Sequence, residues 1–171
     1  KKEIDVQIIF GGIHCILCPE QVIKEDCVDM VCSGEGESII LQLAEEEIPK
    51  TKYTFQPQPL IQDLDSLPFI DRDILYEQKP VFKKDLTIST GRGCPYQCTF
   101  CASNALGKTY GREKLGKYIR QRSVESVLSE LSFCKRKYSP LSVYFTDDVF
   151  TLNIDWLSRF ASEYKRCIAL P

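Results

Sequence analysis

The sequence has no long hydrophobic run and almost no net charge. No apolar stretch approaches the roughly 18 residues that a membrane-spanning helix needs, so no membrane span is expected. The formal net charge is -2, which gives no reason to expect nucleic acid as a partner. The first ten residues lack the apolar core and the small-residue cleavage site of a secretory signal peptide. We therefore expect a cytoplasmic protein.

Cysteine is the residue that stands out. The 171 residues include nine cysteines in a composition typical of a globular protein, 43% hydrophobic and 27% charged. An odd number without a signal peptide argues against a disulfide framework, and clustered cysteines in a reducing compartment more often bind metal. Most of them fall into two groups: Cys15, Cys18, Cys27 and Cys32, and then Cys94, Cys98 and Cys101.

The first part of the chain alternates between strand and helix patterns. An apolar run at 4–10 and another at 28–32 predict buried strands, and each ends in glycines. Helical patterns follow at 19–26 and at 37–47, the latter with Ile40, Leu43 and Ala44 on one side. Strand–helix–strand–helix at these lengths predicts a parallel α/β sheet.

The character changes after Ile48. Five of the nine prolines lie between positions 49 and 80, and no periodicity survives there. This predicts an interdomain linker over 49–84. Its segment LDSLPFIDRDIL mixes apolar and acidic residues, and we expect it to lie across a neighbouring surface.

Order returns with strands predicted at 85–90, 142–148 and 167–170. A helix capped by Ser123 precedes the second of these strands, and another helix at 155–166 precedes the third. The face expected to be buried on the first helix consists of Val124, Val127, Leu128, Leu131 and Cys134. A βαβαβ pattern cut off in its last strand is not a finished domain, so we expect truncation at both ends.

Three cysteines lie together directly after the first of these strands. Cys94, Cys98 and Cys101 form a CxxxCxxC pattern preceded by Gly91 and Gly93. Cysteine thiolates hold iron–sulfur clusters, and most clusters use four of them. Three close thiols can bind three irons of a 4Fe–4S cube and leave the fourth open, as a catalytic zinc keeps an open position. The glycines allow the backbone to turn closely around such a cluster.

The spacing, with Phe100 directly before Cys101, resembles the radical S-adenosylmethionine superfamily. In that family the open iron chelates the methionine end of S-adenosyl-L-methionine, and an electron from the cluster cleaves the sulfonium to give a 5′-deoxyadenosyl radical. The resemblance implies that Cys94, Cys98 and Cys101 ligate a 4Fe–4S cluster and that Phe100 packs near the adenine. It also implies a small-molecule or natural-product-like substrate and an electron donor such as a flavodoxin or ferredoxin.

Other interpretations of the cysteines stay open. A zinc knuckle needs a fourth ligand at CxxC spacing, and none follows Cys101 closely. A ferredoxin run uses CxxCxxC and a following Cys-Pro, which this sequence lacks. The alternative function is an electron-transfer or binding module that holds a cluster without radical chemistry. A third hypothesis is a truncated product without function.

Two acidic residues follow the next strand of the predicted barrel. In such barrels, active sites form at the C-terminal ends of the strands, so Asp147 and Asp148 should open onto the same face as the cysteine loop. In related radical enzymes this strand end contacts the methionine amino group, and the resemblance assigns that role to Asp147 or Asp148. Many relatives have Gly-Gly-Glu there instead, and an ordinary acidic turn is the structural alternative.

The N-terminal part resembles the end of a cobalamin-binding domain found fused to many radical S-adenosylmethionine enzymes. The matching elements are Gly11-Gly12-Ile13-His14, Pro19-Glu20 and Gly34-Glu35-Gly36-Glu37. Ligands of open α/β sheets sit at the carboxyl ends of strands, and glycine there lets a nucleotide tail approach the backbone. The resemblance therefore implies that Gly11, Gly12, Gly34 and Gly36 lie near cobalamin. Cobalamin is expected in a longer parent protein, because the upstream strands are missing here.

Three features of the chain have plain structural interpretations as well as functional ones. His14 belongs to the Gly-Gly-x-His element and is expected to have a local structural role. Cys15 and Cys18 form a CxxC that could bind zinc, although buried cysteine also serves as a small hydrophobe. The basic segment 107–122 is either a solvated loop or a segment from which Arg120 or Arg122 reaches an anionic group such as a substrate or a cofactor carboxylate.

Taken together, the sequence predicts an α/β fold in three parts. Residues 1–48 form the C-terminal end of a Rossmann-like cobalamin-binding domain, 49–84 a linker, and 85–171 the first strands and helices of a partial (β/α) barrel. The predicted activity is reductive cleavage of S-adenosyl-L-methionine, leading to methyl transfer, cyclisation or rearrangement.

Overall fold

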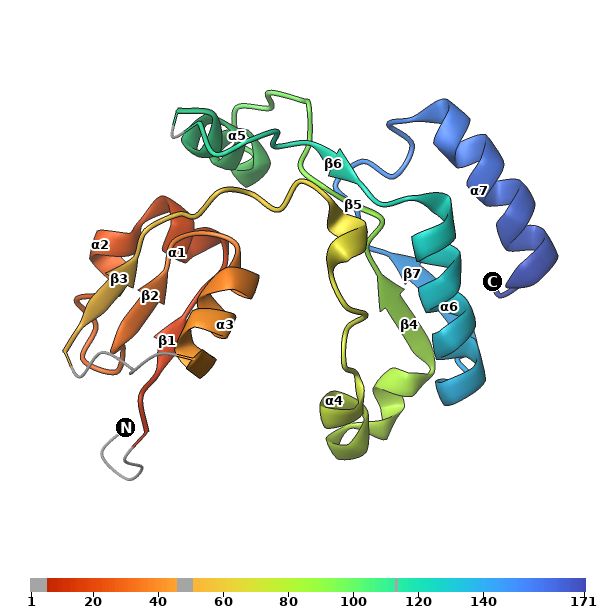
Figure 1. The fold of residues 1–171 in the computed structure, drawn as a ribbon, viewed down its shortest axis with the longest axis horizontal. Coiled ribbons are helices and arrows are strands. Elements are labelled where there is room, and N and C mark those ends of the chain that lie inside the picture. Colours follow the sequence, from red (N-terminus) through yellow and green to blue (C-terminus); the bar gives the residue numbers. More distant parts are fainter. Residues whose placement is uncertain (1–5, 46–50, 113) are drawn as a thin grey trace. The chain divides into compact units, whose positions relative to one another are not determined.

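A computed structural model of the protein describes residues 6–45, 51–112 and 114–171. The chain forms two compact units (Figure 1). The first unit comprises Lys1–Ile61 and Pro95–Tyr118, and the second comprises Gln62–Cys94 and Ile119–Pro171. Because each unit draws on two separate stretches of chain, the predicted domain boundaries at 48 and 84 stay a prediction.

The first unit is a small parallel sheet with helices. Its elements are β1 (Ile9–Phe10), α1 (Ile13–Leu17), α2 (Pro19–Val22), β2 (Met30–Cys32), α3 (Gly36–Glu45), β3 (Tyr53–Phe55) and α5 (Ala102–Arg112). The strand order is β1-β2-β3, and both pairings are parallel. The predicted parallel α/β arrangement is therefore present in this unit.

Burial in the first unit alternates between the two faces of β2. Val31 packs with Cys15 and Val28 on one face, whereas Met30 packs with Ile39 of α3 on the other, as the period of two in a strand requires. The predicted apolar side of α3 is wrong at two of its three positions, because Ile40 is 57% exposed and Ala44 is also exposed, and only Leu43 is partly buried. Positions 46 and 47 of the predicted helix, and positions 4 and 5 of the first predicted strand, lie outside the described residues.

Two elements of the first unit were not predicted. β3 lies inside the predicted linker and pairs with β2 from Met30↔Tyr53 to Cys32↔Phe55. α5 occupies part of the basic segment, and it buries Leu106 and Tyr110 one turn apart. Gly107 and Gly111 lower the helix propensity of this stretch, so the packing of those two side chains decides its conformation.

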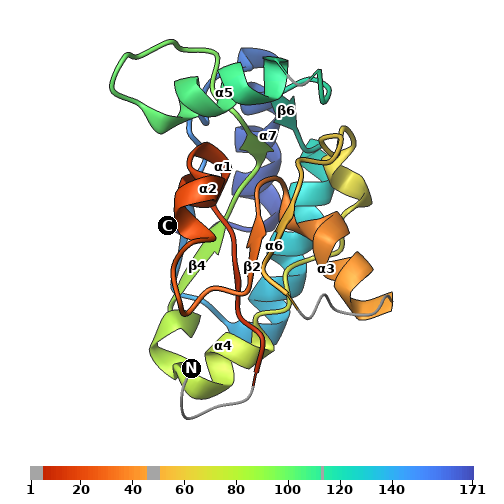
Figure 2. The same cartoon turned by 90° about the vertical axis from the view of Figure 1, so that its left-hand side faces the viewer.

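The second unit contains a βαβ arrangement. Its elements are η1 (Leu64–Ser66), α4 (Asp73–Gln78), η2 (Pro80–Lys83), β4 (Asp85–Ile88), β5 (Gly91–Arg92), β6 (Arg120–Gln121), α6 (Val124–Tyr138), β7 (Ser142–Phe145) and α7 (Ile154–Cys167). β4 pairs in parallel with β7, and β5 pairs antiparallel with β6. α4 and η2 lie at the amino end of β4 (Figures 1 and 2).

One hydrophobic cluster holds β4, α6 and α7 together. Leu86 and Ile88 point to the same face of β4 and pack against the buried side of α6 and against Phe160 of α7. The predicted buried face of α6 is confirmed: Val124, Val127, Leu131 and Cys134 are buried and Leu128 is partly buried. The predicted cap is also confirmed, because the Ser123 hydroxyl accepts a hydrogen bond from the backbone N–H of Ser126 at 3.0 Å.

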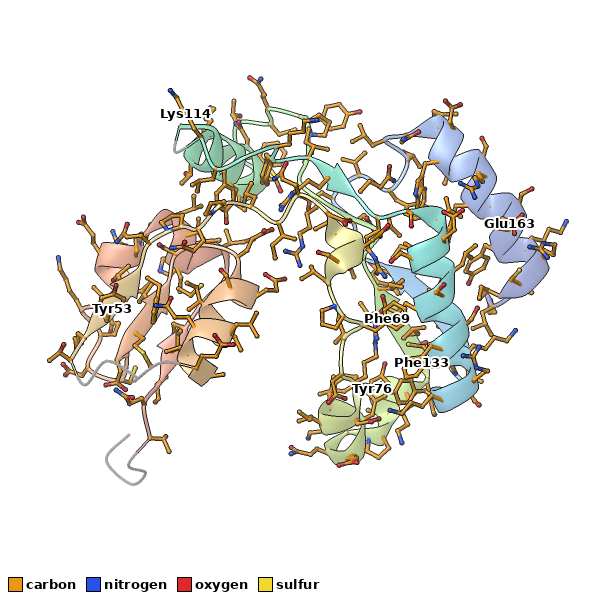
Figure 3. The ribbon with its side chains drawn as sticks, in the orientation of Figure 1. Tyr53, Phe69, Tyr76, Lys114, Phe133 and Glu163 are labelled. Carbon is orange, nitrogen blue, oxygen red and sulfur yellow. The ribbon has the colours of Figure 1, made fainter. Side chains whose placement is uncertain are left out.

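The segment from 62 to 84 is part of this unit and lies along α6, as expected for LDSLPFIDRDIL. Phe69 points toward Phe133 of α6, with ring centroids 6.1 Å apart (Figure 3). Tyr76 is buried and meets Tyr138 edge to face at 4.9 Å. These contacts pack part of a proline-rich stretch without periodicity against α6.

The predicted strand at 167–170 is wrong. α7 continues through Cys167, and Ile168 keeps helical backbone angles while its side chain is fully buried in the cluster. The apolar character of these residues therefore reflects packing into the hydrophobic cluster at the C-terminal end of α7, and not a strand. Beyond it, the backbone N–H of Val143 donates to the carbonyl of Pro171 at 2.8 Å.

The helices in the described part of the chain are not of a membrane-spanning kind. None of them combines enough length with enough apolar character to cross a bilayer.

Leu131→Ala should destabilise the second unit by about 2–5 kcal/mol, because a fully buried leucine leaves a cavity when it is truncated. Urea unfolding followed by the fluorescence of Trp156, the single tryptophan, measures this unit, since that ring packs on its cluster. Leu141→Ala is the control, because Leu141 is 65% exposed, and it should change the stability by less than about 0.5 kcal/mol. Equal effects of the two substitutions would contradict the assigned core.

Asp65→Asn should destabilise the second unit at neutral pH and lose that effect in acid. Partial burial raises the pKa of Asp65, but hydrogen bonds from Ser123, whose N–H lies 3.1 Å from each carboxylate oxygen, prevail and lower it. A carboxyl with a lowered pKa stabilises the folded state above its unfolded-state pKa, and the contribution disappears as the pH falls through the folded-state pKa. Unfolding titrations from neutral pH down through the folded-state pKa of Asp65 should therefore show the free energies of unfolding of Asp65→Asn and the unsubstituted chain becoming equal. Glu77→Gln is the control.

Candidate functional site

The carboxyl ends of β4 and β7 meet at one edge of the second unit. Because the two strands are parallel, with Ile88 opposite Phe145, the residues that follow them lie side by side. After β4 the chain runs through Thr90 and Gly91 to Cys94, and after β7 it reaches Asp147 and Asp148. The predicted common face of the two loops is therefore present within this unit up to Cys94.

Asp147 ties these two strand ends together. Its carboxylate accepts hydrogen bonds from the Thr90 backbone N–H at 3.0 Å to each oxygen, and from the Thr90 hydroxyl at 2.7 Å. Thr90 is fully buried, whereas Asp148 is exposed. The two adjacent acidic residues thus have different surroundings: Asp147 organises the backbone, and Asp148 faces outward.

The two glycines before the cysteine loop are required by the backbone. A Cβ on Gly91 would lie 2.8 Å from the carbonyl oxygen of Arg120 across the β5–β6 pair. Gly93 has φ +88°, a conformation that side chains other than glycine rarely adopt. Glycine is thus needed for a close strand contact at Gly91 and for the backbone angle at Gly93, and a turn of these residues around a cluster stays a prediction.

The cysteine loop is irregular between Gly93 and Ala102, apart from a turn closed by the bond from the Cys101 N–H to the Cys98 carbonyl at 3.1 Å. All three cysteines are free; Cys98 is exposed, and Cys94 and Cys101 are half-buried. Cys94 belongs to the second unit, and Cys98 and Cys101 belong to the first. Among the described residues, no three cysteine, histidine or acidic side chains are gathered into a metal site.

The aromatic residue of the motif lies almost entirely in solvent. Phe100 is 93% exposed. An aromatic side chain exposed to this degree contributes little to the core, and its packing near an adenine stays a prediction.

A cavity of about 480 Å³ opens beside these strand ends in the second unit. Its wall includes Gly91, Arg92 and Gly93 on one side, Arg120 on β6, and Asp147, Asp148 and Asn153 on the β7–α7 connection. Charges of both signs therefore line one cavity, whose wall includes Gly93, the residue before Cys94. No local pattern in the sequence pointed to Arg92 as a wall residue.

The basic segment meets an anionic group inside the protein. Arg122 is half-buried, and its Nη1 lies 2.6 Å from the carboxylate of Glu130. Arg120 is 7% exposed and lines the cavity. Arg122 thus binds a carboxylate of its own unit, and a contact of either arginine with a substrate or cofactor carboxylate stays a prediction. The solvated-loop alternative fails at both positions.

The four glycines that the sequence predicted to follow strands in the first unit do follow them. Gly11 and Gly12 follow β1, and Gly34 and Gly36 follow β2, so both pairs lie at one edge of a parallel sheet. Gly12 has φ +95°, and a Cβ on Gly34 would come within 3.1 Å of the backbone of Pro57. The local backbone therefore explains why glycine occupies positions 12 and 34, whatever role the two residues have toward a ligand.

The other residues of the N-terminal motif have unremarkable surroundings. His14 is exposed on α1. Cys15 is buried in a hydrophobic cluster with Val22, and burial, with a further contribution from Cys32, raises the pKa of its thiol. A raised thiol pKa disfavours the thiolate that zinc would need, so the small-hydrophobe interpretation fits Cys15 better than the zinc interpretation.

The chain is similar to several known proteins. It is 34% identical over 170 residues to an uncharacterized methyltransferase of Pyrococcus horikoshii, covering 87% of this chain and 35% of the relative. It is 26% identical over 188 residues to an anaerobic magnesium-protoporphyrin IX monomethyl ester cyclase of Rubrivivax gelatinosus, covering 95% and 32%. The chain thus spans about a third of the length of these relatives. No protein-family model matches it.

The fold resembles a solved enzyme. The structure of the radical S-adenosylmethionine methyltransferase TsrM from Kitasatospora setae, bound to tryptophan substrate and a cofactor analog, matches with a TM-score of 0.61 and 19% sequence identity. The match covers 96% of this chain and 34% of that one. It confirms an α/β fold shared with that enzyme.

Thr90→Val should cost about 1–2 kcal/mol of stability, because it removes the hydroxyl that donates to the Asp147 carboxylate and keeps the shape of the side chain. Denaturation followed by Trp156 fluorescence measures the change. Thr87→Val, three residues earlier on β4, is the matched control, since Thr87 is exposed, and its effect should stay within about 0.5 kcal/mol. An unchanged stability in Thr90→Val would contradict a contribution of the hydroxyl bond and leave only the backbone N–H bonds between Thr90 and Asp147.

Proposed function

The chain is related to radical S-adenosylmethionine enzymes, and on that basis we propose that it carries the cofactor site of such an enzyme. In this proposal the parent protein reductively cleaves S-adenosyl-L-methionine to a 5′-deoxyadenosyl radical. The observation that carries the proposal is that the chain leaves the parallel strand β4 toward the free thiol of Cys94 beside a cavity lined by both charge signs, and that the two further free thiols of the motif follow Cys94 in the sequence.

The cysteine loop suits an iron–sulfur cluster. Cys94, Cys98 and Cys101 would ligate it, because all three thiols are free and accessible and none is committed to the hydrophobic clusters. The loop has little regular structure of its own, which leaves its backbone free to adapt to a ligand. When bound, a 4Fe–4S cluster with three cysteine ligands supplies an electron and one open iron.

The cavity of the second unit suits the methionine end of the cofactor, which carries an ammonium and a carboxylate. We assign the ammonium to Asp148, because this carboxylate is exposed and lines the cavity, whereas Asp147 holds Thr90. Arg92 and Arg120 supply positive charge in the same wall. Asp147 then acts indirectly, by holding the strand end from which the cysteine loop departs.

Phe100 is proposed to cover the adenine. Its 93% exposed ring gains burial once a planar group stacks on it, and offset stacking of aromatic groups contributes about 0.5–1.5 kcal/mol beyond burial.

The first unit is proposed to be the end of a cobalamin-binding domain joined to a partial (β/α) barrel. Gly11 and Gly12 after β1, with Gly34 and Gly36 after β2, form the edge at which a nucleotide tail could approach the backbone. The parallel order β1-β2-β3 supports this arrangement. Cobalamin binding would need additional strands of a longer protein.

Methyl transfer or cyclisation is the proposed outcome on a small-molecule substrate, since the relatives are named as methyltransferases and cyclases. The required electron would come from a flavodoxin or ferredoxin. Nine free cysteines support a reducing compartment such as the cytoplasm.

Anaerobic reconstitution with iron and sulfide, followed by electron paramagnetic resonance, tests the site. The reduced chain should show a cluster signal that shifts when S-adenosyl-L-methionine is added, because only an open iron can bind it. Cys94→Ala should lose the signal. Cys27→Ala is the matched control, since Cys27 is exposed and free in the first unit, and it should keep both the signal and the shift.

The other outcomes separate the alternatives. A cluster that ignores the cofactor would favour an electron-transfer module. A folded chain that takes up no iron would refute the proposed site.

A further inference from the structure

Glu130 on α6 is a buried charge that the proposed cofactor chemistry does not use. Its side chain is 2% exposed. Its carboxylate lies between two guanidinium groups, 2.8 Å from Nη2 of Arg72 and 2.6 Å from Nη1 of Arg122. Arg72 comes from the 62–84 segment and Arg122 from the β6–α6 junction, so the carboxylate joins two separate stretches of the chain.

Both arginines also reach the end of β4. Nη2 of Arg72 donates to the carbonyl of Thr87 at 3.1 Å, and Nη1 of Arg122 donates to the carbonyl of Ser89 at 3.3 Å. The backbone N–H of Arg122 donates to the carbonyl of Thr90 at 2.8 Å. Three carbonyls within four residues are therefore bound by the two arginines that Glu130 holds in place.

This arrangement complements the bonds from Asp147. Asp147 holds the N–H and hydroxyl of Thr90, whereas the arginines hold carbonyls of the same strand end. Cys94 follows Thr90 by four positions, after the two constrained glycines. The direction in which the chain leaves β4 toward Cys94 is thus fixed from both sides.

Stability alone does not explain a buried carboxylate between two arginines. Removing charges from water is costly, and well-packed apolar residues in place of a buried ion network often give equal or greater stability. Apolar side chains cannot, however, bind backbone carbonyls at defined positions. The network therefore has a positional consequence that a hydrophobic core would not supply.

We propose that Glu130 is a positioning residue for the cysteine loop: through Arg72 and Arg122 it holds residues 87–90 so that Cys94 is presented for ligation. The part of this inference that concerns ligation by Cys94 rests on the proposed function. Its structural content, that Glu130 fixes the end of β4, is independent of any bound cofactor.

Glu130→Gln tests it, because the amide keeps the size of the side chain and removes the charge that holds the two arginines. Hydrogen exchange of the chain without iron is the first measurement. Amides from 88 to 93 should exchange about tenfold faster in Glu130→Gln, while those in the middle of α7 stay unchanged, since local opening need not involve the rest of a unit. Glu125→Gln is the matched control: Glu125 lies on the same helix and pairs with Arg159 at the surface.

The reconstituted chain gives the second measurement. Glu130→Gln should retain iron but need about tenfold more S-adenosyl-L-methionine to produce half of the spectral shift, equal to about 1.4 kcal/mol of binding free energy. Arg122→Lys should act in the same direction, because an ammonium cannot replace a guanidinium whose Nη1 contacts Glu130 and Ser89 while Nε and Nη2 contact Ser126. It also serves where Glu130→Gln fails to fold.

The outcomes distinguish the inference from the function on which it rests. Exchange at 88–93 that matches the Glu125→Gln control would overturn the positioning role, whatever the cluster does. Faster exchange throughout the unit would also overturn it, because Glu130 would then serve general stability. If the unsubstituted chain takes up no cluster, the proposed function is wrong. Faster exchange at 88–93 in Glu130→Gln would then show only that Glu130 fixes the end of β4, without a role in cluster binding.

Discussion

The site in the second unit depends on the hydrogen bonds between Asp147 and Thr90. β4 and β7 are parallel neighbours of only four residues each, and such a short pair does little by itself to fix the course of the chain beyond the strands. The Asp147 carboxylate accepts both donors of Thr90, so the two strand ends form one structure. From this point the chain turns through Gly91 and Gly93 into the cysteine loop, and the wall of the adjoining cavity is set.

Two different physical effects act on the same strand end. The hydrophobic cluster of Leu86, Ile88, α6 and α7 supplies free energy without direction, because burial is not directional. The polar contacts of Arg72, Arg122 and Asp147 supply direction with a small net contribution each. A site that must present a thiol at a defined place needs both the hydrophobic burial and the polar contacts. Here burial acts through the side chains of Leu86 and Ile88, and the polar contacts act on Thr87, Ser89 and Thr90.

Sequence periodicity predicted the elements whose burial is regular. α6, with its Ser123 cap and one buried face, is confirmed because its apolar residues recur every three or four positions. The strand predicted at 167–170 is wrong, because a short apolar run can be a buried segment at a helix end as well as a strand. β3 and α5 were missed because Pro57 and Pro59 mask the strand, and Gly107 and Gly111 weaken the helix signal.

The candidate site shows the same division. The cysteines and glycines are recognisable by their local spacing, so the sequence was sufficient to predict them. The partner of Asp147 and the Arg72–Glu130 pair involve residues more than fifty positions apart, and no local pattern signals such pairs. Folding brings them together, and only then does the different character of Asp147 and Asp148 become visible.

The central claim is that the three cysteines leave one iron of a 4Fe–4S cluster open to S-adenosyl-L-methionine. Mössbauer spectroscopy of the anaerobically reconstituted chain, enriched in the Mössbauer isotope of iron, addresses single iron sites directly. The account predicts that adding the cofactor changes the isomer shift of one iron in four and leaves the other three as they were. A spectrum that does not change with the cofactor would contradict it.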